Sequence, residues 1–199
     1  MREVEPSSRT AHAGQCAGTM IKSIEINRAP VMTLWAVVVA ERLGHSHDEA
    51  LTLGRAVAGL NAYSKAKAIG LISGAEKETR EEKARAKPAK RPDTVELLGR
   101  RVPVVKTKEG WRAVAKDAPL EPGTVERYLK AKFKEALPDV LAAMRKLAAS
   151  RSPKALEIEA YSLYEQFRPA IPAGEAGWGK AGELSLNTIE ALAKKRSGN

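Results

Sequence analysis

One apolar stretch restricts what this chain can fold into. It covers residues 31–40, where a threonine is the only polar residue. A membrane-spanning helix needs about 20 apolar residues, so this stretch is roughly half the required length. Pro30 suits the first turn of a helix, and Gly44 supplies a common helix stop. The sequence therefore predicts a buried helix over about residues 30–43, and no membrane span.

A second helix is predicted directly after this stop. Ser46 and Glu49 have the three-residue spacing of a capping box, and the helical pattern continues to about Ile69. Small residues recur on it every four positions and leave a strip that another backbone can approach closely. These residues are Ala50, Gly54, Ala58 and Ala62. We interpret the strip as a tight helix–helix contact, and self-association through Ala50, Gly54 and Ala58 is the alternative.

The composition favours helices throughout. Aromatic residues make up only 5% of the chain, so Leu, Ile, Val and Ala must form the core. We predict a mainly α, bundle-like fold with an N-terminal helical hairpin, a small β-hairpin in the middle and about four C-terminal helices. The predicted regions are a disordered tail (1–22), the helical hairpin (23–72), a charged linker (73–94) and the β-hairpin with the C-terminal helices (95–199).

The β-hairpin is predicted from two apolar runs, 102–105 and 111–114, on either side of a turn. Helices are expected over about residues 124–136 and 138–149. Ser152 and Pro153 start a further helix, and a last helix covers about residues 187–195. Before the last helix, residues 177–182 match the glycine spacing of dinucleotide-binding loops. Because no strand is predicted before this loop, we interpret it as a turn that folds Trp178 onto the helical core.

The expected compartment follows from the cysteine count and the N-terminal segment. Cys16 is the only cysteine, so no intramolecular disulfide can form. Residues 1–20 carry Glu3, Glu5 and Pro6 where a signal peptide would have a basic end and an apolar run. We therefore expect a cytoplasmic protein.

Positive charge is concentrated in the middle of the chain. The formal net charge is +10, from 34 Lys and Arg against 24 Asp and Glu. Residues 1–82 hold ten basic and ten acidic groups, and residues 152–199 hold six of each. Residues 83–151 therefore carry the whole excess, eighteen basic groups against eight acidic ones. Such a region attracts polyanions, most commonly the phosphates of nucleic acids, although a lysine-rich linker can also be simply solvated.

We predict that basic residues between positions 85 and 134 contact nucleic-acid phosphates. The candidates are Arg85, Lys87, Lys90, Arg91, Arg100, Arg101, Lys106, Lys108, Arg112, Arg127, Lys130 and Lys134. A second set of candidate residues would contact a protein partner. It comprises Ala50, Gly54, Ala58 and Trp178.

The end of the first predicted helix and the start of the second resemble a helix-turn-helix, with Gly44 at the turn. In that motif the second helix enters the major groove, and the hairpin around Lys106 and Lys108 would act as a wing along the backbone. Asp48 and Glu49, however, would meet phosphates at the leading end of the second helix. We therefore favour an ordinary helical hairpin, in which both acids interact with the helix dipole.

Catalytic and metal-binding patterns are sparse. His45 and His47 lie two residues apart at a helix start, where their side chains diverge. Carboxylates such as Glu157 and Glu159 fall on a helix at spacings that point mostly outward, and no pair indicates a general acid and base. We therefore predict no metal, no cofactor and no enzymatic activity.

The function predicted from the sequence is non-enzymatic binding of nucleic acid, with duplex DNA favoured and little sequence selectivity. The alternative is a protein-interaction or regulatory module that self-associates through the small-residue helix and docks an acidic partner through its basic region. Phosphate binding would weaken steeply as salt rises, whereas an apolar dimer interface would not.

Overall fold

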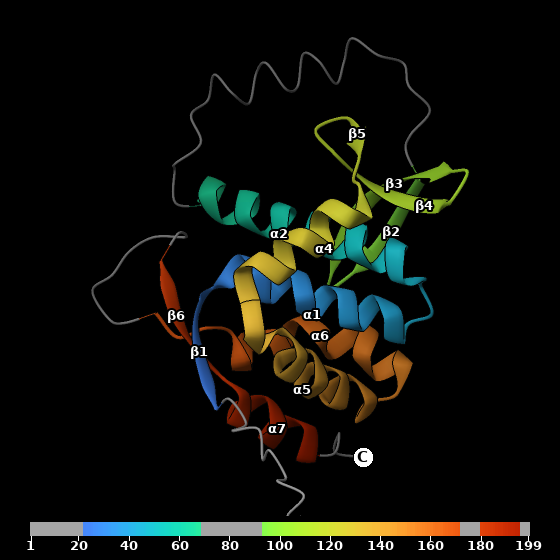
Figure 1. Ribbon diagram of the computed structural model, residues 1–199. Coiled ribbons are helices and arrows are strands. Elements are labelled where there is room, and N and C mark those ends of the chain that lie inside the picture. Colours follow the sequence, from blue (N-terminus) through green and yellow to red (C-terminus); the bar gives the residue numbers. More distant parts are fainter. Residues whose placement is uncertain (1–21, 69–92, 172–179, 196–199) are drawn as a thin grey trace, which may run out of the picture.

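The computed structural model describes residues 22–68, 93–171 and 180–195, with side chains up to Ser64 in the first of these ranges. Helices predominate there, and the strands form two small antiparallel sheets. The helix-dominated fold expected from the composition is therefore confirmed. The predicted bundle-like arrangement is not confirmed, because one side of the molecule is a four-stranded sheet rather than helices (Figure 1).

The apolar stretch of the sequence forms the central helix. Helix α1 (Arg28–Arg42) is buried from Pro30 to Ala40. It lies between α2 (His47–Ala68) on one side and α5 (Leu137–Ala149) and α6 (Pro153–Phe167) on the other (Figure 1). The indole Nε1 of Trp35 donates a hydrogen bond of 2.8 Å to the carbonyl of Ala160. A polar atom on this fully enclosed side chain is thereby satisfied, as burial requires.

Helix α2 (His47–Ala68) runs beside α1 and confirms the predicted hairpin. The turn uses Gly44 at φ +99°, a conformation that residues with a Cβ rarely adopt. The capping box also forms, because the backbone N–H of Ser46 donates to Glu49 Oε2 at 3.2 Å and the Glu49 N–H donates to Ser46 Oγ at 3.4 Å. Both backbone groups at this helix start therefore have partners.

A meander of four strands covers the far side of α2. Its order is β2 (Asp93–Leu97), β3 (Arg100–Thr107), β4 (Gly110–Ala115) and β5 (Ala118–Pro119). The predicted hairpin is β3–β4, whereas β2 and β5 were not predicted, and β2 starts inside the expected linker. In the register of β3 and β4, Val104 lies opposite Ala113 and Lys106 lies opposite Trp111.

The remaining helices are α4 (Pro122–Phe133), a 3-10 turn (Lys134–Ala136), α5 (Leu137–Ala149), α6 (Pro153–Phe167) and α7 (Leu186–Lys194). Helix α4 packs against α2 and α1, whereas α5 and α6 pack on the side of α1 away from α2, and α7 packs against α5 (Figure 1). Helix α6 starts as predicted, because the Ser152 hydroxyl accepts a hydrogen bond of 3.2 Å from the Ala155 N–H. Helix α4 begins at Pro122, before the predicted Thr124, since proline fits the first helical turn.

A two-stranded ribbon joins segments far apart in the chain. Strand β1 (Ser23–Asn27) pairs antiparallel with β6 (Ala181–Ser185), which was not predicted. Gly182 is required in β6, because a Cβ there would overlap the carbonyl of Ala170.

A single hydrophobic core includes buried residues from both helical parts. Within the described ranges, no helix is both long and apolar enough to cross a membrane.

Candidate functional site

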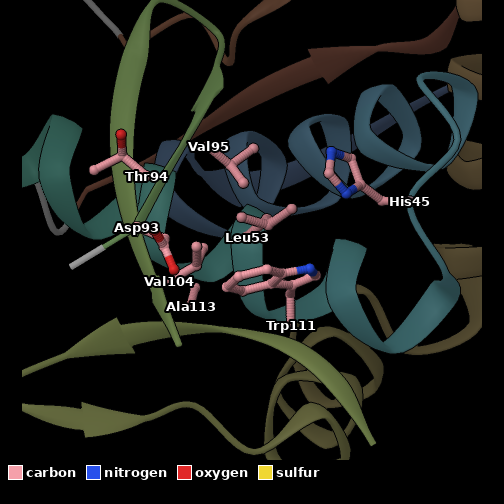
Figure 2. Close-up of a pocket in the computed structure, with 8 residues that line it drawn as sticks. All are labelled: His45, Leu53, Asp93, Thr94, Val95, Val104, Trp111 and Ala113. Carbon is pink, nitrogen blue, oxygen red and sulfur yellow. The ribbon is translucent and has the colours of Figure 1, made fainter. Parts of the chain in front are cut away.

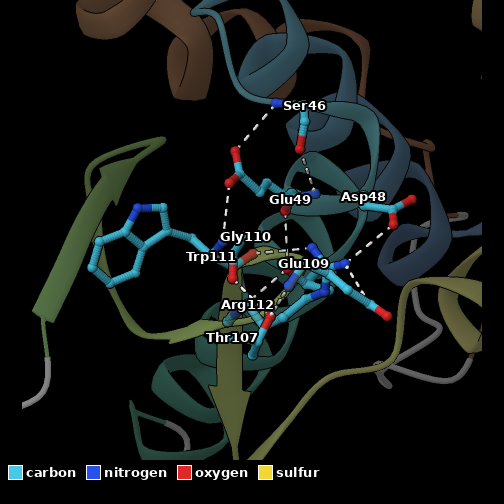
Figure 3. Close-up of polar contacts among 10 residues, drawn as sticks. Ser46, Asp48, Glu49, Thr107, Glu109, Gly110, Trp111 and Arg112 are labelled. Carbon is cyan, nitrogen blue, oxygen red and sulfur yellow. Dashed lines mark hydrogen bonds and ion pairs between the residues drawn. The ribbon is translucent and has the colours of Figure 1, made fainter.

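The turn between β3 and β4 is fixed to the start of α2 by one carboxylate. Glu49 Oε1 accepts a hydrogen bond of 3.0 Å from the Trp111 N–H, while Oε2 accepts from Ser46 (Figure 3). The Trp111 hydrogen bond is the largest influence on Glu49 and, with Ser46 and His45, lowers the pKa of this carboxyl against the opposing effect of burial. Glu49 therefore caps its own helix and holds the hairpin at the same time.

A buried arginine makes the second connection between the hairpin and α2. Arg112 is 3% exposed, and its Nη2 pairs with Asp48 at 3.1 Å and with Glu109 at 3.3 Å (Figure 3). Beside it, the Thr52 hydroxyl donates to the Glu49 carbonyl at 2.9 Å and accepts from the Ala113 N–H at 3.1 Å. Strand β4 is thus attached to α2 by polar contacts along its length.

These contacts rule out the helix-turn-helix interpretation. The leading end of α2, which would read a DNA groove in that motif, is covered by the β3–β4 hairpin. Glu49 faces this hairpin, and Asp48, although 55% exposed, pairs with the buried Arg112 of the hairpin. The ordinary helical hairpin raised from the sequence agrees with the structure.

Between α2 and the sheet lies a pocket of about 320 Å³. Its apolar walls are Leu53 of α2 and Val95, Val104, Trp111 and Ala113 of the sheet. Figure 2 shows the Trp111 ring along one wall with Val95 on the opposite side.

Polar residues lie at both ends of this pocket. His45 occupies one end, and Asp93 with Thr94 lies toward the other (Figure 2). The volume is at the lower limit of the roughly 300–1,000 Å³ that ligand pockets occupy. Apolar walls with polar ends suit a small flat group that is hydrophobic on its faces and polar at its edge.

The structure separates the predicted phosphate-binding residues into three groups. Four of them lie outside the described residues: Arg85, Lys87, Lys90 and Arg91. Two are engaged within the protein. Arg100 donates to Asn61 at 3.1 Å and to Ser64 at 3.4 Å, and Arg112 is buried in its ion pairs. Burial leaves the Arg112 guanidinium no access to a phosphate, so this residue is a structural one.

The six remaining residues are exposed: Arg101, Lys106, Lys108, Arg127, Lys130 and Lys134. Arg101, Lys106 and Lys108 belong to β3 and its turn, and no other described residue forms an ion pair or hydrogen bond with their side chains. On α4, Lys130 pairs with Glu126 at 2.7 Å, and Arg127 donates to the Thr124 hydroxyl at 3.2 Å. The sheet therefore presents the cations with the fewest internal contacts.

The small-residue strip is filled from within the chain. Ala50, Gly54 and Ala58 are buried, and a Cβ on Gly54 would lie 2.7 Å from the Thr33 carbonyl oxygen and 2.7 Å from Val37 Cγ2. Helix α1 therefore occupies the strip, which leaves no open surface there for a second copy. Trp178, the other predicted partner contact, lies outside the described residues.

Both histidines near the site have carboxylate partners. His47 Nδ1 lies 2.6 Å from Glu41 Oε1, and Arg145 reaches the other oxygen of Glu41 at 3.1 Å. His45 lies 3.7 Å from Glu49. In the described part of the chain, no three His, Cys, Asp or Glu side chains are grouped as metal ligands. The arrangement suits binding better than acid–base chemistry.

Sequence reasoning missed the pocket. Trp111 was identified as part of a hairpin and His45 as a residue of a helix start, but the opposite wall belongs to β2, which was not predicted. The alternation of Asp93, Val95 and Leu97 is a signal for a strand. A pairing of this strand with β3 would have placed Val95 beside Val102, as observed.

Comparisons with known proteins provide no assignment. No family model matches the chain, and no curated protein or solved structure is significantly similar to it.

Proposed function

We propose that this protein binds nucleic acid without catalysing a reaction, through phosphate contacts that are weakly selective for sequence. The observation that carries the proposal is the concentration of the whole +10 net charge in residues 83–151. Positive charge of this density attracts the phosphate backbone and releases its condensed counterions.

The exposed cations of the sheet are the strongest candidates for phosphate contacts. Arg101, Lys106 and Lys108 are exposed, whereas Arg100 and Arg112 hold the fold together. Exposed ammonium and guanidinium groups without an internal partner lose no protein contact when they bind a phosphate. The exposed residues Arg127 and Lys130 of α4, with Lys134 of the 3-10 turn that follows it, extend the proposed contacts beyond the sheet.

Fluorescence anisotropy of labelled duplex DNA, titrated at low and near-physiological salt, tests this function. A variant with Arg101, Lys106 and Lys108 changed to Ser should bind more weakly, and its salt dependence should fall by roughly one slope unit per cation removed. The matched control changes Lys22, Lys154 and Lys194 to Ser, three exposed lysines outside residues 83–151. Equal losses in both variants would indicate a general effect of net charge, and no binding at low salt would refute the proposal.

A protein-interaction module is the second candidate. Among the described residues, β2 is at the edge of its sheet, where an added strand can pair with its backbone. An acidic partner would be attracted by the same cations. This candidate takes first place if the DNA titrations show no binding.

A further inference from the structure

The pocket between α2 and the sheet has one aromatic wall. The Trp111 indole lies along one side, and the aliphatic side chains of Leu53 and Val95 lie on the other (Figure 2). An aromatic face offers stacking to any flat π system, and nucleobases are the flat π systems that a phosphate-binding protein meets. A volume of about 320 Å³ leaves room for one base and excludes a large cofactor.

Asp93, at one end of the pocket, favours a particular edge of a base. The carboxylate of Asp93 only accepts hydrogen bonds, so it pairs with an N–H₂ group and repels a carbonyl oxygen. Adenine, cytosine and guanine each carry an exocyclic amino group. Thymine and uracil present carbonyl oxygens at the corresponding edge.

The sheet register places a cation beside the stacking surface. Lys106 lies opposite Trp111 in the β3–β4 pair, so the two side chains emerge on the same face of the sheet. Directly opposite residues in an antiparallel pair have Cβ atoms about 4.5–5.5 Å apart. Because Lys106 is exposed and has no partner among the described residues, its ammonium is available to a phosphate next to the stacked base.

We infer that this pocket binds one unpaired nucleobase that carries an exocyclic amino group, stacked on Trp111 and hydrogen-bonded to Asp93, while Lys106 contacts the adjoining phosphate. The inference rests on the proposed function and extends it from the phosphates to a base. A base inside a duplex is paired and stacked, so the pocket favours single strands or unpaired positions over intact duplex.

Three labelled oligomers separate this inference from the proposed function. They are oligo(dC), oligo(dT) and an abasic strand, each about 12 nucleotides long, within the roughly 4–16 nucleotides that single-strand sites cover. All three carry the same phosphates, and their binding to the full chain is compared at one salt concentration. We expect oligo(dC) to bind roughly tenfold more tightly than oligo(dT), and the abasic strand to bind most weakly.

Asp93→Asn should reduce the preference for oligo(dC) over oligo(dT) to about twofold or less, because an amide can also donate to a carbonyl oxygen. Glu96→Gln is the matched control, since it removes the same charge from the opposite face of the same strand and should keep the wild-type preference. Trp111→Phe should retain part of the stacking, whereas Trp111→Leu should bring oligo(dC) close to the abasic strand.

The outcomes are distinguishable. Equal binding of oligo(dC) and the abasic strand would overturn the base pocket but leave the phosphate-binding function in place. The same preference in Asp93→Asn and Glu96→Gln would remove Asp93 from the site. Failure of all three oligomers to bind at low salt, while duplex DNA binds, would overturn the inference alone, and failure of the duplex as well would refute the proposed function.

Discussion

Helix α2 packs against two neighbours in different ways. Toward α1 it presents Gly54 and Ala58, and the two backbones approach so closely that a Cβ on Gly54 has no space. Toward the sheet it presents Leu53, and a cavity of about 320 Å³ remains between them. One helix therefore has a close-packed side and an open side.

The difference follows from what holds each contact together. The α1–α2 contact depends on shape, since small side chains allow dispersion contacts along both backbones. The α2–sheet contact depends on directed polar interactions of Glu49, Thr52 and Arg112 with the hairpin. Such interactions fix a distance and do not require the remaining space to be filled. The open side is consequently where a ligand can bind.

The largest expected effect is on the close-packed side. Gly54→Val should destabilise the fold by about 3 kcal/mol, because the added carbons would push α2 away from the backbone of α1. Urea denaturation measures the change. Gly59→Ala is the control in the same helix: its Cβ would meet open space, and the gain in helix propensity should stabilise by about 0.5–1 kcal/mol. Equal tolerance of both substitutions would contradict the close approach of the helices.

The buried arginine should affect stability rather than binding. Arg112→Ala should cost about 2 kcal/mol of unfolding free energy, because it removes ion pairs and leaves a void between β4 and α2. Asp48 and Glu109 are 55% and 80% exposed, so water can solvate them once the arginine is gone. Arg101→Ala, at an exposed position of β3, should change stability by less than about 0.5 kcal/mol and weaken DNA binding. Thermal unfolding and fluorescence anisotropy of both variants measure the two effects. A larger loss of stability in Arg101→Ala than in Arg112→Ala would contradict these roles.

Glu49 should make the open side sensitive to acid. Its pKa is lower in the folded protein, so the stabilisation is fully present above the pKa of the unfolded chain and is lost as the pH falls through the folded value. At neutral pH, Glu49→Gln should cost about 1 kcal/mol. Between about pH 5 and pH 3 the difference between wild type and variant should shrink, as thermal unfolding across this range will test. If the difference in stability between wild type and variant stayed constant over this pH range, the effect would come from the shape of the side chain and not from its charge.

The smallest effect is expected inside the pocket. Ala113→Val adds two methyl groups to a buried residue that lines the pocket, and valine favours strands. The unfolding free energy should change by less than about 0.5 kcal/mol, in contrast to Gly54→Val. A loss comparable to that of Gly54→Val would show that the sheet side of α2 is packed as closely as the α1 side.

The helices were predictable because their signals are local. The apolar stretch of α1, the Ser46–Glu49 capping box and the Ser152 cap each involve residues within one or two turns. Of the missed strands, β1 and β6 pair across most of the chain, whereas β2 and β5 pair with their neighbours in the chain through tight turns. Leu98 adopts φ +50° in the β2–β3 turn, where glycine or asparagine is the usual residue, so Gly99 was the only turn signal in the sequence there.

The candidate site was only partly predictable, for the same reason. The sequence alone does not show which basic side chains are exposed. It therefore did not distinguish the exposed Lys106 from the buried Arg112. Asp48, the partner of Arg112, is distant in sequence and comes next to it only when the hairpin reaches α2. The pocket is likewise formed by three segments that no local pattern connects.

The β1–β6 ribbon has a consequence for the time course of folding. Strand β1 is made long before β6, and the chain between them contains every other described element except α7. During synthesis the edge of β1 must therefore stay unpaired while the helices around α1 assemble. Contacts between such distant segments form slowly. Until they form, the unpaired edge of β1 can pair with strands of other chains. Closure of this ribbon would then be a late step of folding, and the chain is open to aggregation through β1 until it is complete.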